Sequence, residues 1–353
     1  MARRGFSIFD PCRISNREPC AKIQSGCGIC GKDEPLLGCS RCRVMVYCGR
    51  EHQVEHKSTC KAIERARASL EEQEQILRDS SSSDPFIHGS INEFGPEMRS
   101  YILHRCVLVG MISGINTREA VEKQLEHSME ILRLCPKDNL GARKTVAPMM
   151  IRLNQDRECY AFLKSWVLVS NRSYDNWSNP GLPRFNVESA DIFESVDMFL
   201  GLNIGISLTV PLCLLKLKTF LDLSLVEAQK GSARSTGPVG TSREYFNSLR
   251  NAVTRSQALL STPNFTNPTT RISTLSRLQF QVDVLFNEVN RTHPDFWPAL
   301  LNPQGFLDRP FVVTSGGEDF VDETQGILSA SYDAWHDTIG AITFVEGKLG
   351  HRR

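Results

Sequence analysis

Apolar residues recur every three or four positions along most of the chain after residue 60, which is the spacing of one face of an amphipathic helix. Strand-like alternation of apolar and polar residues is scarce. The striped positions are Ile63, Ala66, Leu70 and Leu77; Met98, Ile102, Cys106, Val109 and Ile112; Val121, Leu125, Met129 and Leu132; Ile272, Leu275, Leu278, Val282, Leu285 and Val289; and Val321, Thr324, Leu328, Tyr332, Trp335 and Ile339. The pattern therefore predicts an all-α body made of several helices.

Local start signals support these helices. Asn116, followed three residues later by Glu119, resembles a capping box for the stripe that begins at Val121. Asp138 is a candidate N-cap for the next helix, and a further helix is expected over 157–169. Only about two to five residues separate these helices, and such short joints are typical of helical hairpins stacked side by side.

Two stretches depart from the amphipathic pattern. The segment 204–215 is the most apolar in the chain, but its roughly twelve residues fall short of the eighteen or so that a membrane-spanning helix needs. Pro211 also interrupts it, so we expect a buried core helix and no membrane association. The segment 293–311 is rich in proline and aromatic residues and is expected to form an ordered loop packed on the helices.

The N-terminal part of the chain carries eight cysteine and histidine residues at metal-ligand spacing. Structural zinc takes four thiolate or imidazole ligands, and closely spaced pairs usually supply two of them each. The four pairs are Cys27 with Cys30, Cys39 with Cys42, Cys48 with His52, and His56 with Cys60. This set is sufficient for two tetrahedral zinc sites, that is, two zinc ions per chain.

Disulfide bonds are the competing interpretation of these cysteines. The first residues, Met1 to Arg4, lead into a polar stretch without an apolar signal segment, so we expect an intracellular, reducing setting, either cytoplasmic or nuclear. Four other cysteines lie in apolar helical stretches and are expected in the core: Cys106, Cys135, Cys159 and Cys213. Cys12 and Cys20 lie in the polar N-terminal arm and are expected to be idle thiols.

The four ligands Cys48, His52, His56 and Cys60 recur every four residues and would form one stripe on a helix. The first and last would then lie roughly 18 Å apart, whereas the ligands of one zinc ion lie within about 4 Å of each other. Each half of the stripe must therefore combine with one of the Cys-x-x-Cys pairs. The spacing leaves both the cross-braced and the sequential pairing open.

The run from Cys27 to Cys60, CGICGKDEPLLGCSRCRVMVYCGREHQVEHKSTC, closely resembles a MYND-type zinc finger. The resemblance rests on the ligand spacing, the Tyr47-Cys48 step and Gln53, and it covers about a tenth of the chain. His52 stands where many members have cysteine. Only three residues separate His52 from His56, where the family usually has more, and the tryptophan common in that gap is absent.

The resemblance implies a cross-braced module with two ligand sets. Zinc 1 would be bound by Cys27, Cys30, Cys48 and His52, and zinc 2 by Cys39, Cys42, His56 and Cys60. It also implies protein partners, among them short proline-containing peptides, with Gln53 and an exposed Tyr47 as candidates for the peptide groove. The alternative for Tyr47 is that its ring packs beneath the finger, because so small a module owns few apolar residues.

A second resemblance concerns the segment PKDNLGARKTVAPMMIRLNQDRECYAFLKSW, which is similar to a helix pair found in tetratricopeptide-like arrays and in fungal MYND-domain proteins. The expected fold is therefore an all-α helical-hairpin body of TPR-like, α-solenoid character, preceded by a small cross-braced two-zinc MYND finger. The expected organisation is a disordered arm at 1–24, the finger at 25–62, an exit helix at 63–79, a linker at 80–92, and an all-α domain at 93–353 with a flexible loop near 229–242.

Charge and motifs narrow the function. The chain of 353 residues has a net charge of +1, and its first 67 residues hold thirteen Lys and Arg against seven Asp and Glu. These basic residues are scattered singly, which disfavours a nucleic-acid surface. Gly-x-x-x-x-Gly-Lys-Ser/Thr, Gly-x-Ser-x-Gly and His-Glu-x-x-His motifs are absent, and four protein ligands per zinc leave no position for a reacting water.

The sequence thus favours a non-enzymatic, zinc-binding adaptor that binds protein partners or short proline-containing peptides. Two alternatives remain beside it. One is a relative of the SET-type lysine methyltransferases, some of which carry MYND fingers, although neither an Asn-His-x-Cys motif nor a run of short strands is found. The other is a nucleic-acid-associated transcriptional regulator. Five histidines outside the finger are dispersed and are expected to be surface or core residues: His88, His104, His127, His293 and His336.

Overall fold

The computed structural model describes residues 23, 26–32, 35–81, 84–86, 95–135, 138, 140–170, 190–201, 204–233, 267–307 and 323–350. The chain divides into two compact units. The first comprises Met1–Leu153, Tyr174–Leu182 and Gln304–Asp333, and the second comprises Asn154–Ser173, Pro183–Pro303 and Ala334–Arg353. The predicted arm at 1–24 lies almost entirely outside the described residues.

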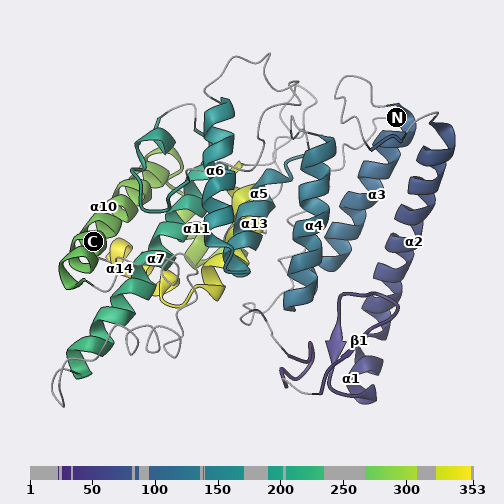
Figure 1. The fold of residues 1–353 in the computed structure, drawn as a ribbon, viewed down its shortest axis with the longest axis horizontal. Coiled ribbons are helices and arrows are strands. Elements are labelled where there is room, and N and C mark those ends of the chain that lie inside the picture. Colours follow the sequence, from purple (N-terminus) through teal and green to yellow (C-terminus); the bar gives the residue numbers. More distant parts are fainter. Residues whose placement is uncertain are drawn as a thin grey trace. The chain divides into compact units, whose positions relative to one another are not determined.

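The first unit joins a small finger to a row of helices (Figure 1). Helix α2 packs on α3, α3 packs on α4, and α4 packs on α5. The two strands pair antiparallel, with Leu37 opposite Tyr47. The elements are β1 Leu37–Gly38, β2 Val46–Tyr47, α1 Arg50–Glu55, α2 Lys57–Ser80, α3 Pro96–Ile112, α4 Arg118–Leu134 and α5 Arg143–Arg152.

The predicted apolar stripes form the core of this unit. Ile63, Leu70 and Leu77 of α2 are buried, as are Ile102 and Cys106 of α3. Helix α2 begins at Lys57, before Ile63, the first residue of the predicted apolar stripe. Apolar periodicity could not predict this first turn, because it contains ligand residues rather than ordinary apolar ones. The exit helix is therefore continuous with the finger.

The two predicted helix starts differ in outcome. Helix α4 is capped by Thr117, not by Asn116, and the Thr117 side chain accepts a hydrogen bond from the Ala120 backbone N–H. Asp138 lies one turn before α5, with a positive φ of 52°, and its carboxylate accepts from the N–H groups of Ala142 and Arg143. Asp138 therefore stabilises the start of α5, but the prediction that it is the N-cap is wrong, because Ala142 occupies that position.

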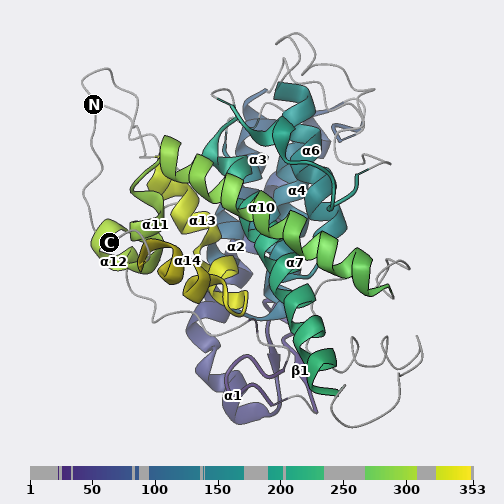
Figure 2. The ribbon, with the colours of Figure 1, turned by 90° about the vertical axis from the view of Figure 1, so that its left-hand side faces the viewer.

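The second unit is organised around α7, which packs against α10 and α6 (Figure 2). Trp297 stacks on Phe286 with ring centroids 4.4 Å apart and meets Trp335 edge-on at 5.3 Å. The elements are α6 Asp156–Ser170, the 3-10 helix η3 Asp197–Phe199, α7 Ile206–Ala233, α10 Pro268–Thr292, α11 Phe296–Leu301 and α14 Ala341–Gly350. Helices α12 (Pro303–Leu307) and α13 (Glu323–Asp337) include residues of both units.

Three expectations for this part of the chain need correction. The segment after His293 forms two short helices, α11 and α12, rather than a loop, because Phe296 and Trp297 are drawn into the aromatic core. Ile272 is 59% exposed and lies off the buried stripe of α10. Helix α7 continues to Ala233 and so enters the predicted loop, the rest of which lies outside the described residues.

The all-α prediction is confirmed: the described residues are predominantly helical, and their one sheet has two short strands. The apolar segment 204–215 forms a buried helix from Ile206 onward, as expected. Among the described residues, no helix combines the length and apolar character needed to cross a membrane. A TPR-like arrangement and the domain boundaries stay predictions.

Candidate metal centre

The two Cys-x-x-Cys pairs form two turns of the same construction. In the first turn, the Gly31 N–H donates to the Cys27 carbonyl at 2.7 Å; in the second, the Arg43 N–H donates to the Cys39 carbonyl at 2.9 Å. The residue after the second cysteine is left-handed in both, with φ of 72° at Gly31 and 59° at Arg43. Each turn therefore presents its two sulfur atoms to the same side, as a chelating pair requires.

The first ligand cluster joins the first pair to the third. The candidate ligand atoms of Cys27, Cys30, Cys48 and His52 all lie within 4.8 Å of one another. His52 Nδ1 is 3.5 Å from Cys27 Sγ and 3.2 Å from Cys48 Sγ, and the sulfurs of Cys30 and Cys48 are 3.5 Å apart. Helix α1 supplies His52, and the turn before it supplies Cys48.

The second ligand cluster joins the second pair to the start of α2. The sulfurs of Cys39, Cys42 and Cys60 lie within 4.8 Å of one another, with Cys39 and Cys60 at 3.5 Å. His56 Nε2 lies 3.3 Å from Cys42 Sγ. His56 is the N-cap residue of α2 and Cys60 lies in its first turn, so helix geometry places both on the same side.

Both clusters fit zinc. Tetrahedral coordination with Zn–S of about 2.3 Å and Zn–N of about 2.0–2.1 Å places neighbouring ligand atoms roughly 3.5–3.8 Å apart. The measured separations are close to these values, whereas a disulfide would require sulfurs about 2.05 Å apart. Cys27 and Cys30 lie beside Cys48 and His52, and not beside His56 and Cys60. The pairing is therefore cross-braced, and the sequential alternative is wrong.

Local electrostatics favour the thiolate form at one cysteine of each cluster, whereas burial raises the pKa of Cys42 and Cys60 and the neighbouring Cys30 sulfur raises the pKa of Cys48. Burial raises the pKa of the Cys27 thiol, but the backbone N–H groups of Cys30, Ile29 and Cys48 outweigh it and bring the pKa to about 6. Cys39 behaves alike, with a pKa of about 7. Burial lowers the pKa of His56, which keeps its imidazole neutral. Backbone donors aimed at sulfur are the supporting hydrogen bonds typical of metal ligands.

Tyr47 is a packing residue and not an exposed groove residue. Its side chain is only 2% exposed, and its ring centroid lies 5.8 Å from that of His56. The expectation that Tyr47 faces a peptide is therefore wrong, and the alternative that it packs beneath the finger is right. Gln53, in contrast, is exposed on α1. Val54 and Leu37 are 62% and 65% exposed apolar residues of the finger that the sequence did not single out.

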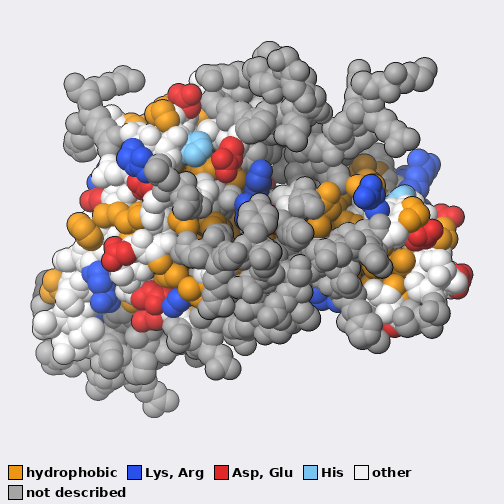
Figure 3. All heavy atoms as spheres, turned by 90° about the horizontal axis from the view of Figure 1, so that it is seen from above, with side chains coloured by type: hydrophobic (Ala, Val, Ile, Leu, Met, Phe, Trp, Pro, Cys, Tyr) orange, Lys and Arg blue, Asp and Glu red, His pale blue; other side chains and the backbone are white. Residues whose placement is uncertain are grey.

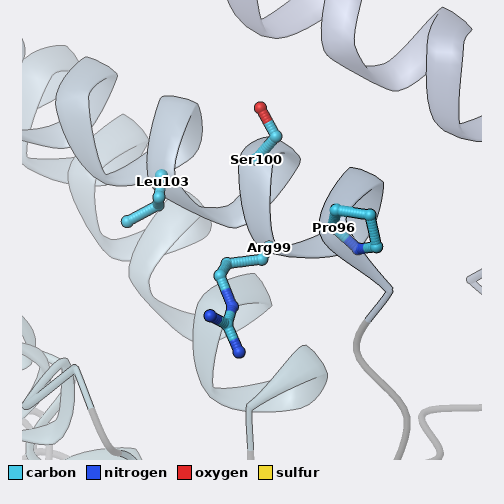
Figure 4. A pocket seen from close by; sticks show the side chains of 4 residues that line it. All are labelled: Pro96, Arg99, Ser100 and Leu103. Atoms are coloured by element: carbon cyan, nitrogen blue, oxygen red, sulfur yellow. The ribbon is translucent and has the colours of Figure 1, made fainter.

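Residues outside the finger behave mostly as expected. The four body cysteines Cys106, Cys135, Cys159 and Cys213 are buried, whereas Cys12 and Cys20 lie outside the described residues. His127 of α4 is hydrogen-bonded to Arg105, and burial lowers its pKa to about 4. A pocket at the start of α3 is lined by Pro96, Arg99, Ser100 and Leu103, which bring no acid–base pair together (Figure 4).

Comparison with known proteins agrees with this geometry. Residues 27–62 match the family model of the MYND finger. "Egl nine homolog 1" of Homo sapiens is 44% identical over 52 residues, which make up 14% of this chain and 12% of that protein, so the chain spans only a small part of this relative. No solved structure matches. The chain therefore contains a MYND finger, a zinc-binding module of protein–protein interactions, in front of a helical body.

Proposed function

We propose that this MYND finger protein is a zinc-binding adaptor whose finger and helical body bind protein partners, with short proline-containing peptides as ligands of the finger. The supporting observation is the pair of closed ligand clusters. We assign Cys27, Cys30, Cys48 and His52 to zinc 1, and Cys39, Cys42, His56 and Cys60 to zinc 2. Four protein ligands per ion favour a folding role over catalysis.

The exposed surface of the finger supports the peptide proposal. Gln53 and Val54 lie on α1, which packs against β2, and Leu37 lies on the strand paired with β2. An exposed side-chain amide beside exposed apolar side chains can bind an extended peptide. The amide forms hydrogen bonds with the peptide backbone, while the apolar groups contact the peptide side chains. Proline suits such a surface because a proline-containing segment loses little conformational entropy on binding.

The alternatives draw less support from the described residues. The two short strands of the finger make up their only sheet, whereas a SET fold requires a run of strands. On the face drawn in Figure 3, the described Lys and Arg side chains are mixed with Asp and Glu rather than gathered into a basic surface. A nucleic-acid interface needs such a surface to neutralise phosphates.

Metal analysis of the purified chain tests the ligand assignment. We expect two zinc ions per chain, and Cys27→Ser and Cys60→Ser should each remove about one ion because each variant opens a different site. Cys106→Ala is the matched control, since Cys106 is buried in α3 outside both clusters. A chain without zinc, or one that keeps both ions after Cys27→Ser, would contradict the assignment.

A peptide array tests the proposed ligand class. The intact protein should select proline-containing peptides, Gln53→Ala should weaken their binding, and Cys27→Ser should abolish it. Gln75→Ala on the exposed face of α2 is the control and should bind like the intact protein. Equal selection by intact and zinc-free protein would contradict the proposal. Reproducible methyl transfer from S-adenosylmethionine to a protein would favour the methyltransferase alternative instead.

A further inference from the structure

The finger is attached to the helical body by a buried threonine. Thr117 is the N-cap of α4 and is only 1% exposed. Its hydroxyl oxygen accepts from the Ala120 N–H at 3.3 Å, and the same hydroxyl donates to the carbonyl of Val44 at 3.1 Å. Val44 follows the second cysteine turn directly. One side chain therefore caps a body helix and bonds the finger backbone at the same time.

Close packing surrounds this hydrogen bond. Gly28, inside the first cysteine turn, has no room for a side chain: an added Cβ would lie 2.4 Å from Met45 Sδ and 3.0 Å from Thr117 Cγ2. Val44 and Met45 are buried as well. The N–H of Gly28 donates to the Val46 carbonyl at 2.9 Å. Both cysteine turns thus lie against Thr117, at the end of the turn between α3 and α4.

A second connection runs through α2. His56 precedes this helix and Cys60 lies in its first turn, with the Cys60 N–H donating to the His56 carbonyl at 2.9 Å. One turn later, Ile63 is fully buried, and α2 packs along α3. The proposed ligands of zinc 2 therefore fix the first turn of a helix that forms part of the body core.

We propose that zinc occupancy of the finger controls the order of the turn where α3 passes into α4, with Thr117 as the coupling residue. Without zinc, the cysteine turns lose the constraint that holds the Val44 carbonyl against Thr117. The start of α4 then loses a packing partner, and the finger loses one of its two connections to the body. Zinc acts on the helical body through this contact. The proposal rests on the zinc ligation proposed above.

Hydrogen exchange on the full chain, with and without zinc removed by a chelator, tests this coupling. Zinc removal should raise exchange in the finger and also at residues 118–121 of α4. Loss of a typical N-cap corresponds to roughly a fivefold loss of protection, so we expect a rise in exchange of up to about that size at the start of α4. Residues 269–272 at the start of α10 should not change. A change confined to the finger would overturn the proposal.

Substitution of Thr117 tests the coupling with zinc kept in place. Thr117→Val removes both hydrogen bonds of the hydroxyl and should leave zinc content unchanged. Exchange should rise at residues 118–121 and also at the Gly28 and Cys39 amides, whose acceptors are Val46 and Met45. Thr117→Ser keeps the hydroxyl and should restore protection in both places, which separates loss of the bond from a change in packing.

A matched control is available in α10. Asn267 caps that helix by accepting from the Thr269 N–H, and the described structure places it in the second unit. Asn267→Ala should raise exchange at the start of α10 and leave the finger unchanged. If Thr117→Val behaves like this control, with the finger amides unaffected, the coupling is refuted. If the intact chain holds no zinc, the ligand assignment fails, and the Thr117 variants alone decide whether the finger is docked.

Discussion

The buried ion pair between α6 and α7 allows a quantitative test of the second unit. Lys218 Nζ lies 2.6 Å from Asp156 Oδ1, and the two side chains are 6% and 0% exposed. At an effective dielectric constant of about 20, the attraction is roughly 6 kcal/mol. Desolvation costs several kcal/mol per ion, so the intact pair contributes little net stability. Removal of one partner leaves the other charge buried without compensation, which costs about 3–5 kcal/mol.

We therefore expect Asp156→Asn and Lys218→Met each to lower the free energy of unfolding of this unit by about 3–5 kcal/mol. Asp156→Asn combined with Lys218→Met should lose much less than the sum of the single changes, with a coupling energy of at least about 2 kcal/mol. Urea unfolding followed by fluorescence measures these values, because Trp166 and Trp297 are buried in this unit.

A partly exposed ion pair provides the comparison. Lys348 Nζ of α14 and Asp283 Oδ1 of α10 are 2.6 Å apart in the same unit, and their side chains are 33% and 36% exposed. Asp283→Asn should change the free energy of unfolding of this unit by no more than about 1 kcal/mol, since solvent screens such pairs. If Asp156→Asn lies within about 1 kcal/mol of the intact protein, or if the single and double changes simply add, the reasoning about the buried pair is refuted.

Three further outcomes follow from burial and packing. Leu278→Ala should destabilise the second unit by about 2–5 kcal/mol in urea unfolding, and Ile272→Ala by less than about 0.5 kcal/mol, because only Leu278 is buried. Burial lowers the pKa of His127 from 6.5 to about 4, so below pH 6.5 the unfolded chain binds a proton that the folded chain does not. The free energy of unfolding should therefore fall as the pH falls from 6.5 to 4. His127→Gln should flatten that part of the curve of stability against pH. Gly28→Ala should destabilise the finger by about 1–3 kcal/mol in thermal unfolding, and it should cost less when Met45 is already replaced by alanine.

Each of these three predictions would be refuted by a different result. Equal losses for Leu278→Ala and Ile272→Ala would mean that the buried face of α10 is wrongly placed. An unchanged pH profile after His127→Gln would mean that this histidine is not held neutral. If Gly28→Ala costs as much with Met45→Ala as without it, the close contact between these two residues does not decide the stability of the finger.

The long apolar stripes predicted the helices well. Which residue is buried near the end of a helix, however, depended on partners that are distant in the sequence. Leu278, Val282 and Leu285 are buried as the period indicated. In the first turn of α10, however, Arg271 is buried in place of Ile272, because its guanidinium pairs with Glu227 of α7. Such a partner cannot be read from local periodicity. The segment after His293 was missed for a related reason: helices of five or six residues leave no periodic signal.

The ligand pairs of the finger were predictable because metal ligation is encoded in short spacings. The choice between the two pairings was not, since it depends on how the turns fold onto α1 and α2. Thr117 could not be found from the sequence at all. It lies 73 residues from Val44 along the chain, and a threonine before a helix is ordinarily explained by its capping role alone.

The nearly continuous helical run from Arg50 to Ser80, broken at His56, limits how the finger can change in length. Each residue inserted between His52 and His56 would rotate the later ligands by about 100° and advance them by about 1.5 Å. His56 and Cys60 would then turn away from Cys39 and Cys42. An insertion between Cys30 and Cys39 leaves the spacing inside every ligand pair unchanged. Sequence length can therefore vary between the cysteine turns, whereas the longer gap that the MYND family usually has between His52 and His56 requires a loop between α1 and α2 in place of the break at His56.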